Sequence, residues 1–320
     1  MGKCLVTKLN GVVDNDSLLK INEIRFKIIK NESQNVPKIL IGTNKETTIK
    51  IIGDGYFTND KLSENRGKTM TSVVGDNTIY LSNNNLELSV EDKFCLTKIV
   101  SSTSISIDIS SLKHITNLIQ LNITGSQVTG DILSLKNLTG LVWCALSRSQ
   151  ITGDIAAVKD MLNVEWIDTA YTNITGNINA LDKLTKLKTS SFNRLTGNIL
   201  SINNTKLTSL VIRNSGGLTG DIAKLNPDVV YIGLENDTTS RFTWSSRSTE
   251  SKIFGNDGTP IIDGNLDNML INMAKCQNGI TSSTSQSEKR ISYAGTRTSA
   301  SDEAVQKLQE YGYTVIITNV

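Results

Sequence analysis

The chain has 320 residues, enough for about two domains of ordinary size. Lysine and arginine (33) nearly balance aspartate and glutamate (31), and the resulting net charge of +2 argues against a strong electrostatic hold on nucleic acid or on an anionic membrane. There is one histidine, which excludes catalysis by paired histidines and a multi-histidine metal site. Asn (32), Thr (35) and Ser (33) make up 100 of the 320 residues and aromatic residues only 5%, a composition that favours short strands and turns over thick helical layers.

The sequence shows no targeting or membrane segment. The N-terminal residues have no apolar core followed by a small-residue cleavage site, so no secretory signal is predicted. No uncharged apolar run reaches about 18 residues, so we expect no transmembrane helix and no membrane insertion. The four cysteines (Cys4, Cys95, Cys144 and Cys276) lie far apart without a CxxC pair, and we expect neither a disulfide framework nor a zinc site.

Residues 1–93 alternate apolar and polar side chains in short stretches separated by Gly, Asn and Asp. The stretches are 24–28, 47–52, 78–81 and 86–90. Such alternation is typical of strands with one buried face, so we predict a small antiparallel β domain. We expect this domain to cover one end of the segment that follows it, or to attach the chain to another protein.

Residues 94–235 contain an internal repeat. The tetrapeptide Thr-Gly-Asp/Asn-Ile recurs with steps of 23, 23, 21 and 23 residues, starting at Thr129, Thr152, Thr175, Thr196 and Thr219. Residues 106–109 keep the same frame without the glycine, as a degenerate first copy would. Before each tetrapeptide, apolar residues stand at i, i+3 and i+5, as in Leu118, Leu121 and Ile123. This is the LxxLxL pattern of a leucine-rich repeat, and the copies have a suitable length.

The repeat predicts a short strand, a turn at Thr-Gly, and a loosely wound return. Asp or Asn after the glycine suits a turn, because its side chain can bond to nearby backbone groups. That role explains Asp131, Asp154 and Asp221 without a calcium ladder, so we expect no metal and no cofactor. One copy lacks two residues between Leu187 and Leu195, where we expect a local irregularity. No copy can bury its leucines alone, so the copies must stack into a curved solenoid.

Residues 236–320 end the chain with mixed elements. A polar loop is expected up to residue 250, and apolar residues from Leu266 to Ala274 then follow helical spacing. A strand at 291–293, a helix at 302–311 and a strand at 314–317 predict a repeat-like cap that continues the parallel sheet. The expected fold is therefore mainly β with short helices: a leucine-rich-repeat solenoid preceded by a small antiparallel β domain and closed by a strand-helix-strand cap.

The most informative exposed positions are those between the buried leucines, which should form a concave surface. The column before the second leucine reads Gln120, Trp143, Trp166, Thr189, Ser209 and Tyr231, so two of the three tryptophans share it. The residues expected to bind a partner are Trp143, Trp166, Tyr231, Glu165, Asp168, Gln120, Asn122 and Arg213. Aromatic rings offer contact area at low entropic cost, while polar neighbours set orientation. An alternative remains open, in which the tryptophans pack under a terminal domain or inside a homo-oligomer.

Nothing in the sequence favours catalysis. A glycan hydrolase needs two carboxylates about 5 to 9 Å apart in a cleft. Glu165 and Asp168 stand three apart on a predicted strand, so their side chains should point to opposite faces. The single histidine, His114, is expected on the surface of the return segment. We therefore expect no catalytic residue and no enzymatic activity.

Two segments resemble known proteins. The repeats, with Tyr-Ala-Gly-Thr-Arg-Thr-Ser-Ala-Ser-Asp at 293–302 and Tyr-Gly-Tyr-Thr-Val at 311–315, resemble leucine-rich-repeat proteins encoded by Bacteroidales bacteria and their phages. The opening residues 1–9, with Asn-Asp-Ser-Leu at 15–18 and Glu-Ile-Arg at 23–25, are similar to the start of tail-region virion proteins of crAss-like phages.

The resemblance implies a structural protein of the phage tail, either a receptor-binding tail fibre or a tail-associated component, assembled in the host cytoplasm and located in the virion. Residues 1–93 would then bind other tail proteins, while the solenoid would face a host surface glycan or protein, or a partner virion subunit. Tail appendages are symmetric multimers, so a homo-oligomer is expected. The alternative is a bacterial cell-surface or secreted leucine-rich-repeat adhesin.

Overall fold

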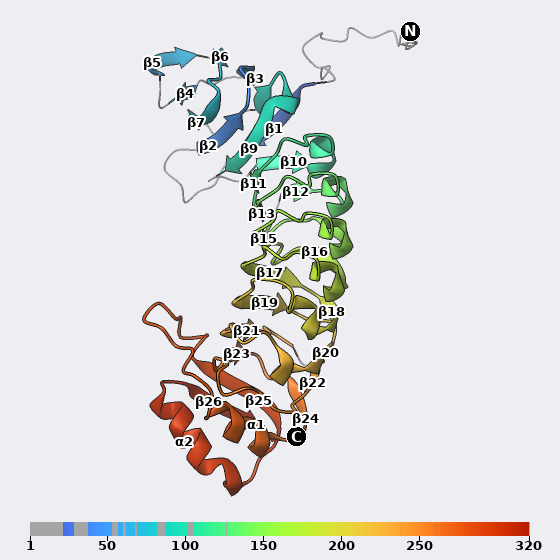
Figure 1. The fold of residues 1–320 in the computed structure, drawn as a ribbon. Coiled ribbons are helices and arrows are strands. Elements are labelled where there is room, and N and C mark those ends of the chain that lie inside the picture. Colours follow the sequence, from blue (N-terminus) through green and yellow to red (C-terminus); the bar gives the residue numbers. More distant parts are fainter. Residues whose placement is uncertain are drawn as a thin grey trace.

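The computed structural model describes residues 22–28, 38–52, 57–59, 62–67, 69–81, 87–101, 105–125, 127–237 and 239–319. Cys4 and the resemblance at residues 1–9 and 15–18 lie outside these residues. Figure 1 shows an elongated solenoid with the N-terminal strands at one end and two helices at the other. Within the described part of the chain, no helix is long and apolar enough to cross a membrane.

The main sheet contains one strand from each repeat. Eight consecutive parallel strands run along it: β9 (Leu96–Ser101), β11 (Gln120–Asn122), β13 (Trp143–Ala145), β15 (Trp166–Asp168), β17 (Thr189–Asn193), β19 (Ser209–Arg213), β21 (Tyr231–Gly233) and β23 (Gly255–Asp257). The signature residues Leu118, Leu121 and Ile123 are fully buried, as the LxxLxL pattern predicts. The leucine-rich-repeat solenoid is confirmed.

A second sheet lies on the opposite side of the solenoid (Figure 1). It is built from β14 (Thr152–Asp154), β16 (Asn173–Asn177), β18 (Leu195–Asn198), β20 (Leu218–Asp221), β22 (Arg241–Thr243), β24 (Ile261–Asn265), β25 (Arg290–Thr296) and β26 (Thr314–Thr318). The prediction of a plain turn at Thr-Gly was therefore wrong. Each Thr-Gly-Asp/Asn segment is extended enough to pair with the next copy, and these hydrogen bonds form only when the copies stack.

In the repeats a 3-10 helix follows the strand on this side, as after β14, β16, β18 and β20. The six that keep the repeat frame are η2 (Ile109–Leu112), η3 (Ile132–Leu135), η4 (Ile155–Val158), η5 (Ile178–Leu181), η6 (Ile199–Ile202) and η7 (Ile222–Lys224). Each starts at an Asp or Asn whose side-chain oxygen accepts a hydrogen bond from a backbone N–H two residues later, at 2.8 to 3.1 Å. The backbone-bonding role predicted for Asp131, Asp154 and Asp221 is thus confirmed as helix N-capping.

Two features of the structure explain why every full copy of the tetrapeptide has glycine at its second position. Gly153 has a φ of +111°, in the left-handed region that favours glycine. A Cβ atom there would lie well inside the van der Waals distance of the Asp131 Oδ1 atom of the preceding copy. Asp131 therefore caps its own helix and also contacts the glycine of the next repeat, which links the copies along the solenoid.

The shortened copy is irregular, as predicted. In the preceding copy, four residues separate the end of β15 at Asp168 from the start of β16 at Asn173. In the shortened copy, only Arg194 separates β17 from β18. Arg194 makes the turn with a φ of +48°. The two missing residues are thus absent from the turn that joins the main-sheet strand of the copy to its strand in the second sheet.

The N-terminal domain is antiparallel and continues the sheets of the solenoid. Its strands are β1 (Ile24–Ile28), β2 (Lys38–Thr43), β3 (Thr48–Ile52), β4 (Phe57–Asn59), β5 (Leu62–Gly67), β6 (Thr69–Thr71), β7 (Gly75–Leu81) and β8 (Glu87–Val90), followed by η1 (Lys93–Cys95). The main sheet extends through β2, which pairs antiparallel with β9. A separate sheet joins β1, β3, β6 and β8 to β10 (Ile105–Asp108) and β12 (Val128–Thr129). The predicted antiparallel strands are present, and the domain covers the first repeat.

The C-terminal part keeps the repeat geometry beyond residue 235. The loop expected up to residue 250 contains β22, and β23 continues the main sheet. The predicted helices are α1 (Leu266–Met273) and α2 (Asp302–Glu310), with η8 (Ser299–Ser301) before α2. Strands β25 and β26 pair in parallel, which confirms a cap that continues a parallel sheet, although the sheet is the second one.

Asp267 ties this cap together. Burial alone would raise its pKa, but hydrogen bonds from Ser301 Oγ at 2.6 Å and from the Thr298 side chain and backbone lower it to about 2. The carboxylate therefore joins the first turn of α1 to the segment before α2.

Candidate functional site

The strand face is the outward side of β11, β13, β15, β17, β19 and β21. In Figure 1 the N-terminal strands and the C-terminal segment both extend beyond the solenoid on the side where these strands lie. The strand register places the predicted column side by side, with Gln120 opposite Trp143, Trp143 opposite Trp166, and Trp166 opposite Thr189. The strand face thus forms a surface bordered at both ends by other parts of the chain.

Trp143 and Trp166 form a stacked pair. Their ring centroids lie 4.5 Å apart with 9° between the ring planes. Both residues are half-buried, and the Nε1 atom of Trp143 is buried without a hydrogen-bond partner. Because the two facing ring surfaces cover one another, the pair offers mainly ring edges to a partner. This geometry favours contact with a protein or glycan surface over insertion of a flat ligand between the rings.

Tyr231 does not belong to the exposed column, contrary to the prediction. Its side chain is only 4% exposed. Burial, with the charge of Asp257 nearby, raises the pKa of Tyr231 to about 12, and Ser287 is close enough to oppose that shift. The backbone at residues 288–290 runs against Gly255 on the adjacent strand. The C-terminal segment therefore covers this end of the strand face.

Gln120 and Asn122 lie at the opposite end of the strand face and are half-buried. Gln120 stands in register between Lys98 of β9 and Trp143 of β13. Asn122 stands next to Ala145, which is 6% exposed. The structure therefore brings both residues beside the tryptophan pair, as the column alignment predicts.

The two predicted carboxylates have separate roles. Asp168 accepts a hydrogen bond from the Ala170 backbone N–H at 3.0 Å, which holds the turn after β15. Burial, together with the Asp168 charge, raises the pKa of the Cys144 thiol to about 12, so this cysteine stays protonated and unreactive at neutral pH. Glu165 forms an exposed ion pair with Lys188 at 2.6 Å, and this contact lowers the pKa of Glu165.

Arg213 connects its own repeat to three others. Its guanidinium forms an ion pair with Glu235 (Nε to Oε2, 2.7 Å) and donates a hydrogen bond to Ser191 Oγ at 2.5 Å. It also lies 4.7 Å from the ring centroid of Tyr171, within cation–π distance. The predicted residue Arg213 is therefore half-buried and held in place by contacts on both sides.

Tyr171 is the residue that sequence reasoning missed. It is 54% exposed, and Arg148 of the preceding repeat lies 5.8 Å from its ring centroid. Its φ is +57°, in the left-handed region. The equivalent residues of all six copies have a positive φ, and we call them the left-handed column: Gly125, Arg148, Tyr171, Arg194, Asn214 and Asn236. Glycine and asparagine at three of these positions are the sequence signal that could have revealed the column.

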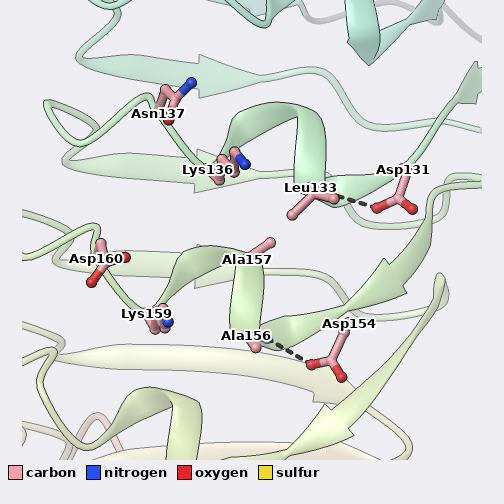
Figure 2. Close-up of a pocket in the computed structure, with 9 residues that line it drawn as sticks. All are labelled: Asp131, Leu133, Lys136, Asn137, Asp154, Ala156, Ala157, Lys159 and Asp160. Carbon is pink, nitrogen blue, oxygen red and sulfur yellow. Dashed lines mark hydrogen bonds between the residues drawn. The ribbon is translucent and has the colours of Figure 1, made fainter.

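A shallow groove of about 650 Å³ lies on the side of the 3-10 helices (Figure 2). Asp131 and Asp154 line it, each bonded to the first turn of its own helix, while Lys136 and Lys159 lie at the other end of these helices. Leu133, which projects there, is 55% exposed. The carboxylates of Asp131 and Asp154 already have backbone partners, as the N-caps of their own helices. His114, which follows η2 in the first of these return segments, is exposed, as expected.

No family model matches the sequence, and no curated protein matches it. Solved structures with a similar fold include PEPR1 bound to AtPEP1 (14% identity, TM-score 0.44, 70% of this chain and 35% of that one). Internalin C2 of Listeria monocytogenes is another (16%, 0.37, 72% and 83%). A third is the ectodomain of the Arabidopsis receptor kinase HAESA with a peptide hormone ligand (17%, 0.33, 69% and 46%). The chain thus spans about a third of the PEPR1 chain, and the similarity concerns the leucine-rich-repeat fold.

Proposed function

We propose that the protein is a binding module whose strand face recognises a partner through the tryptophan pair and the polar residues beside it. The observation that carries this proposal is the stacked Trp143–Trp166 pair on the surface of the main sheet. Its neighbours Gln120, Asn122, Asp168 and Arg213 supply hydrogen-bonding groups around an apolar centre. Such a centre with a polar rim is typical of recognition surfaces.

The partner that we propose is a host surface molecule or a neighbouring virion subunit, with the protein acting in the tail of a phage. The support is the resemblance of the opening residues and of residues 293–302 to phage-encoded proteins. In this setting residues 1–93 attach the chain to other tail proteins, and copies of the chain form a homo-oligomer. A bacterial surface or secreted adhesin is the second candidate, since it would use the same strand face.

The strand face is tested by replacing both tryptophans. Trp143→Ala with Trp166→Ala should abolish binding of the purified chain to host cells or to purified tails, because the apolar centre is lost. Trp143→Phe with Trp166→Phe keeps two stacked rings and should retain most of the binding, which controls for folding. Unchanged binding and unchanged oligomer size in the alanine variant would remove the strand face from the proposal.

The biological setting is tested separately. Mass spectrometry of purified virions should detect the chain in a fixed ratio to the other tail proteins. Detection only in the envelope or culture medium of a bacterium would favour the adhesin. Size-exclusion chromatography with light scattering measures the oligomer, and a monomer at all concentrations would contradict the proposed multimer.

A further inference from the structure

The left-handed column breaks a local rule in its middle three copies. Residues other than glycine rarely adopt a positive φ, and Asn is the most tolerant of them. The outer copies follow this preference with Gly125, Asn214 and Asn236. Arg148, Tyr171 and Arg194 do not, with φ values of 58°, 57° and 48°. Long side chains kept at strained positions point to a function for those side chains.

The two arginines of the column also have no carboxylate partner. Among the described residues, neither Arg148 nor Arg194 forms an ion pair, and both are exposed. The acidic residues further along the same edge are already engaged: Glu235 with Arg213, Asp237 with Ser215, and Asp257 with Arg290. Asp168, in the repeat of Tyr171, accepts a hydrogen bond from the Ala170 N–H and forms no ion pair among the described residues, so the two arginines outnumber it on the middle of this edge.

The shortened repeat lies at the centre of this charge. The turn made by Arg194 alone brings β17 directly into β18, and the Arg213 guanidinium reaches across β17 to Ser191 and to the ring of Tyr171. Arg148 of the preceding repeat thus contacts the Tyr171 ring from one side. Arg213, which lies two repeats after Tyr171, contacts the ring from the other side. Both cations lie within cation–π distance of the Tyr171 ring, and the exposed arginines beside it favour an anion.

We propose that Arg148 and Arg194, set on either side of Tyr171, bind an acidic peptide segment of a partner protein that runs along the solenoid. Arg148 follows β13 and Arg194 follows β17, and β15 lies between these two strands in the main sheet. Adjacent strands are about 5 Å apart, so the two arginine backbones are about 10 Å apart. In an extended polyproline-type segment, every third residue returns to the same side after about 9 Å. Acidic residues at such spacing can each bind one arginine. The proposal deepens the proposed recognition function, since it names the chemistry of a partner on the strand side.

The test uses the full chain and a labelled probe peptide, Glu-Pro-Pro-Glu-Pro-Pro-Glu, in fluorescence anisotropy. Arg148→Asn with Arg194→Asn should weaken binding about tenfold, as two charge pairs are lost. The matched control, Lys113→Asn with Lys159→Asn, removes the same charge from two positions two repeats apart on the 3-10 helix side and should change binding less than about twofold. Arg148→Lys with Arg194→Lys keeps the charge and should retain binding within about threefold.

Four results would overturn the inference. The first is equal binding of a Gln-Pro-Pro-Gln-Pro-Pro-Gln peptide, and the second is equal weakening by the lysine control. The third is tight binding of polygalacturonate without binding of the peptide, which would make the occupant an acidic polysaccharide. The fourth is unfolding of the double asparagine variant, since Asn should fit the left-handed positions at least as well as Arg. All these variants keep both tryptophans. If the tryptophan variant loses binding to host cells or tails while the arginine variants bind the acidic peptide as well as the unmodified chain does, this inference is contradicted and the proposed function is not.

Discussion

The two sides of each coil follow their local rules to different degrees. On the side of the 3-10 helices, every copy from η2 to η7 begins with a capping Asp or Asn, and each copy of the tetrapeptide keeps its glycine. Along the left-handed column, only the outer copies use the residues that the backbone prefers. The uniform side, like the main sheet, contributes to holding the copies together, whereas we infer that the irregular column keeps its side chains for contact with a partner.

The largest expected effect is on the uniform side. Gly153→Ala places a Cβ atom against Asp131 Oδ1 at a left-handed position, and we expect a loss of about 3 kcal/mol in the free energy of unfolding. Gly264→Ala is the matched control, because Gly264 has a similar φ of +109° and no atom within 4 Å of the added Cβ, so the loss should be about 1 kcal/mol. Urea unfolding measures both, and equal losses would show that contact between copies is unimportant.

A smaller effect is expected at the caps. Asp154→Ala removes the acceptor for the Ala156 N–H, which should cost about 1 kcal/mol. Asp160→Ala, at the other end of the same groove, removes an exposed carboxylate that has no helix to cap, so it should leave the unfolding midpoint nearly unchanged (Figure 2). The thermal midpoints of both variants give the comparison. A larger shift for Asp160→Ala would contradict the capping role.

Much of the fold could be predicted because its signals are local. The apolar period places the strands of the main sheet, and helical spacing places α1. The second sheet could not be recognised, because a Thr-Gly-Asp segment pairs only with the same segment of a neighbouring copy. The continuation past residue 235 was missed for a related reason: Phe242 and Phe254 supply buried side chains there without the LxxLxL spacing.

The candidate site was predictable where strand register alone decides position. That register brought Trp143 beside Trp166. The burial of Tyr231 was not predictable, because the covering segment near Ser287 is far away in sequence. Tyr171 and Arg148 were missed because the residue type at these two positions does not indicate a positive φ. Only Gly125, Asn214 and Asn236 at equivalent positions indicate it.

The most direct test exchanges residues within the left-handed column and measures the free energy of unfolding. Arg194→Asn should raise it, and Asn214→Arg should lower it, each by about 0.5 to 1 kcal/mol, because Asn accepts a positive φ more readily than Arg. Both residues are exposed, so packing changes little. Opposite shifts are the result we predict. Destabilisation by Arg194→Asn would show that the arginine supports the fold, and would contradict the claim that the middle copies retain it for recognition.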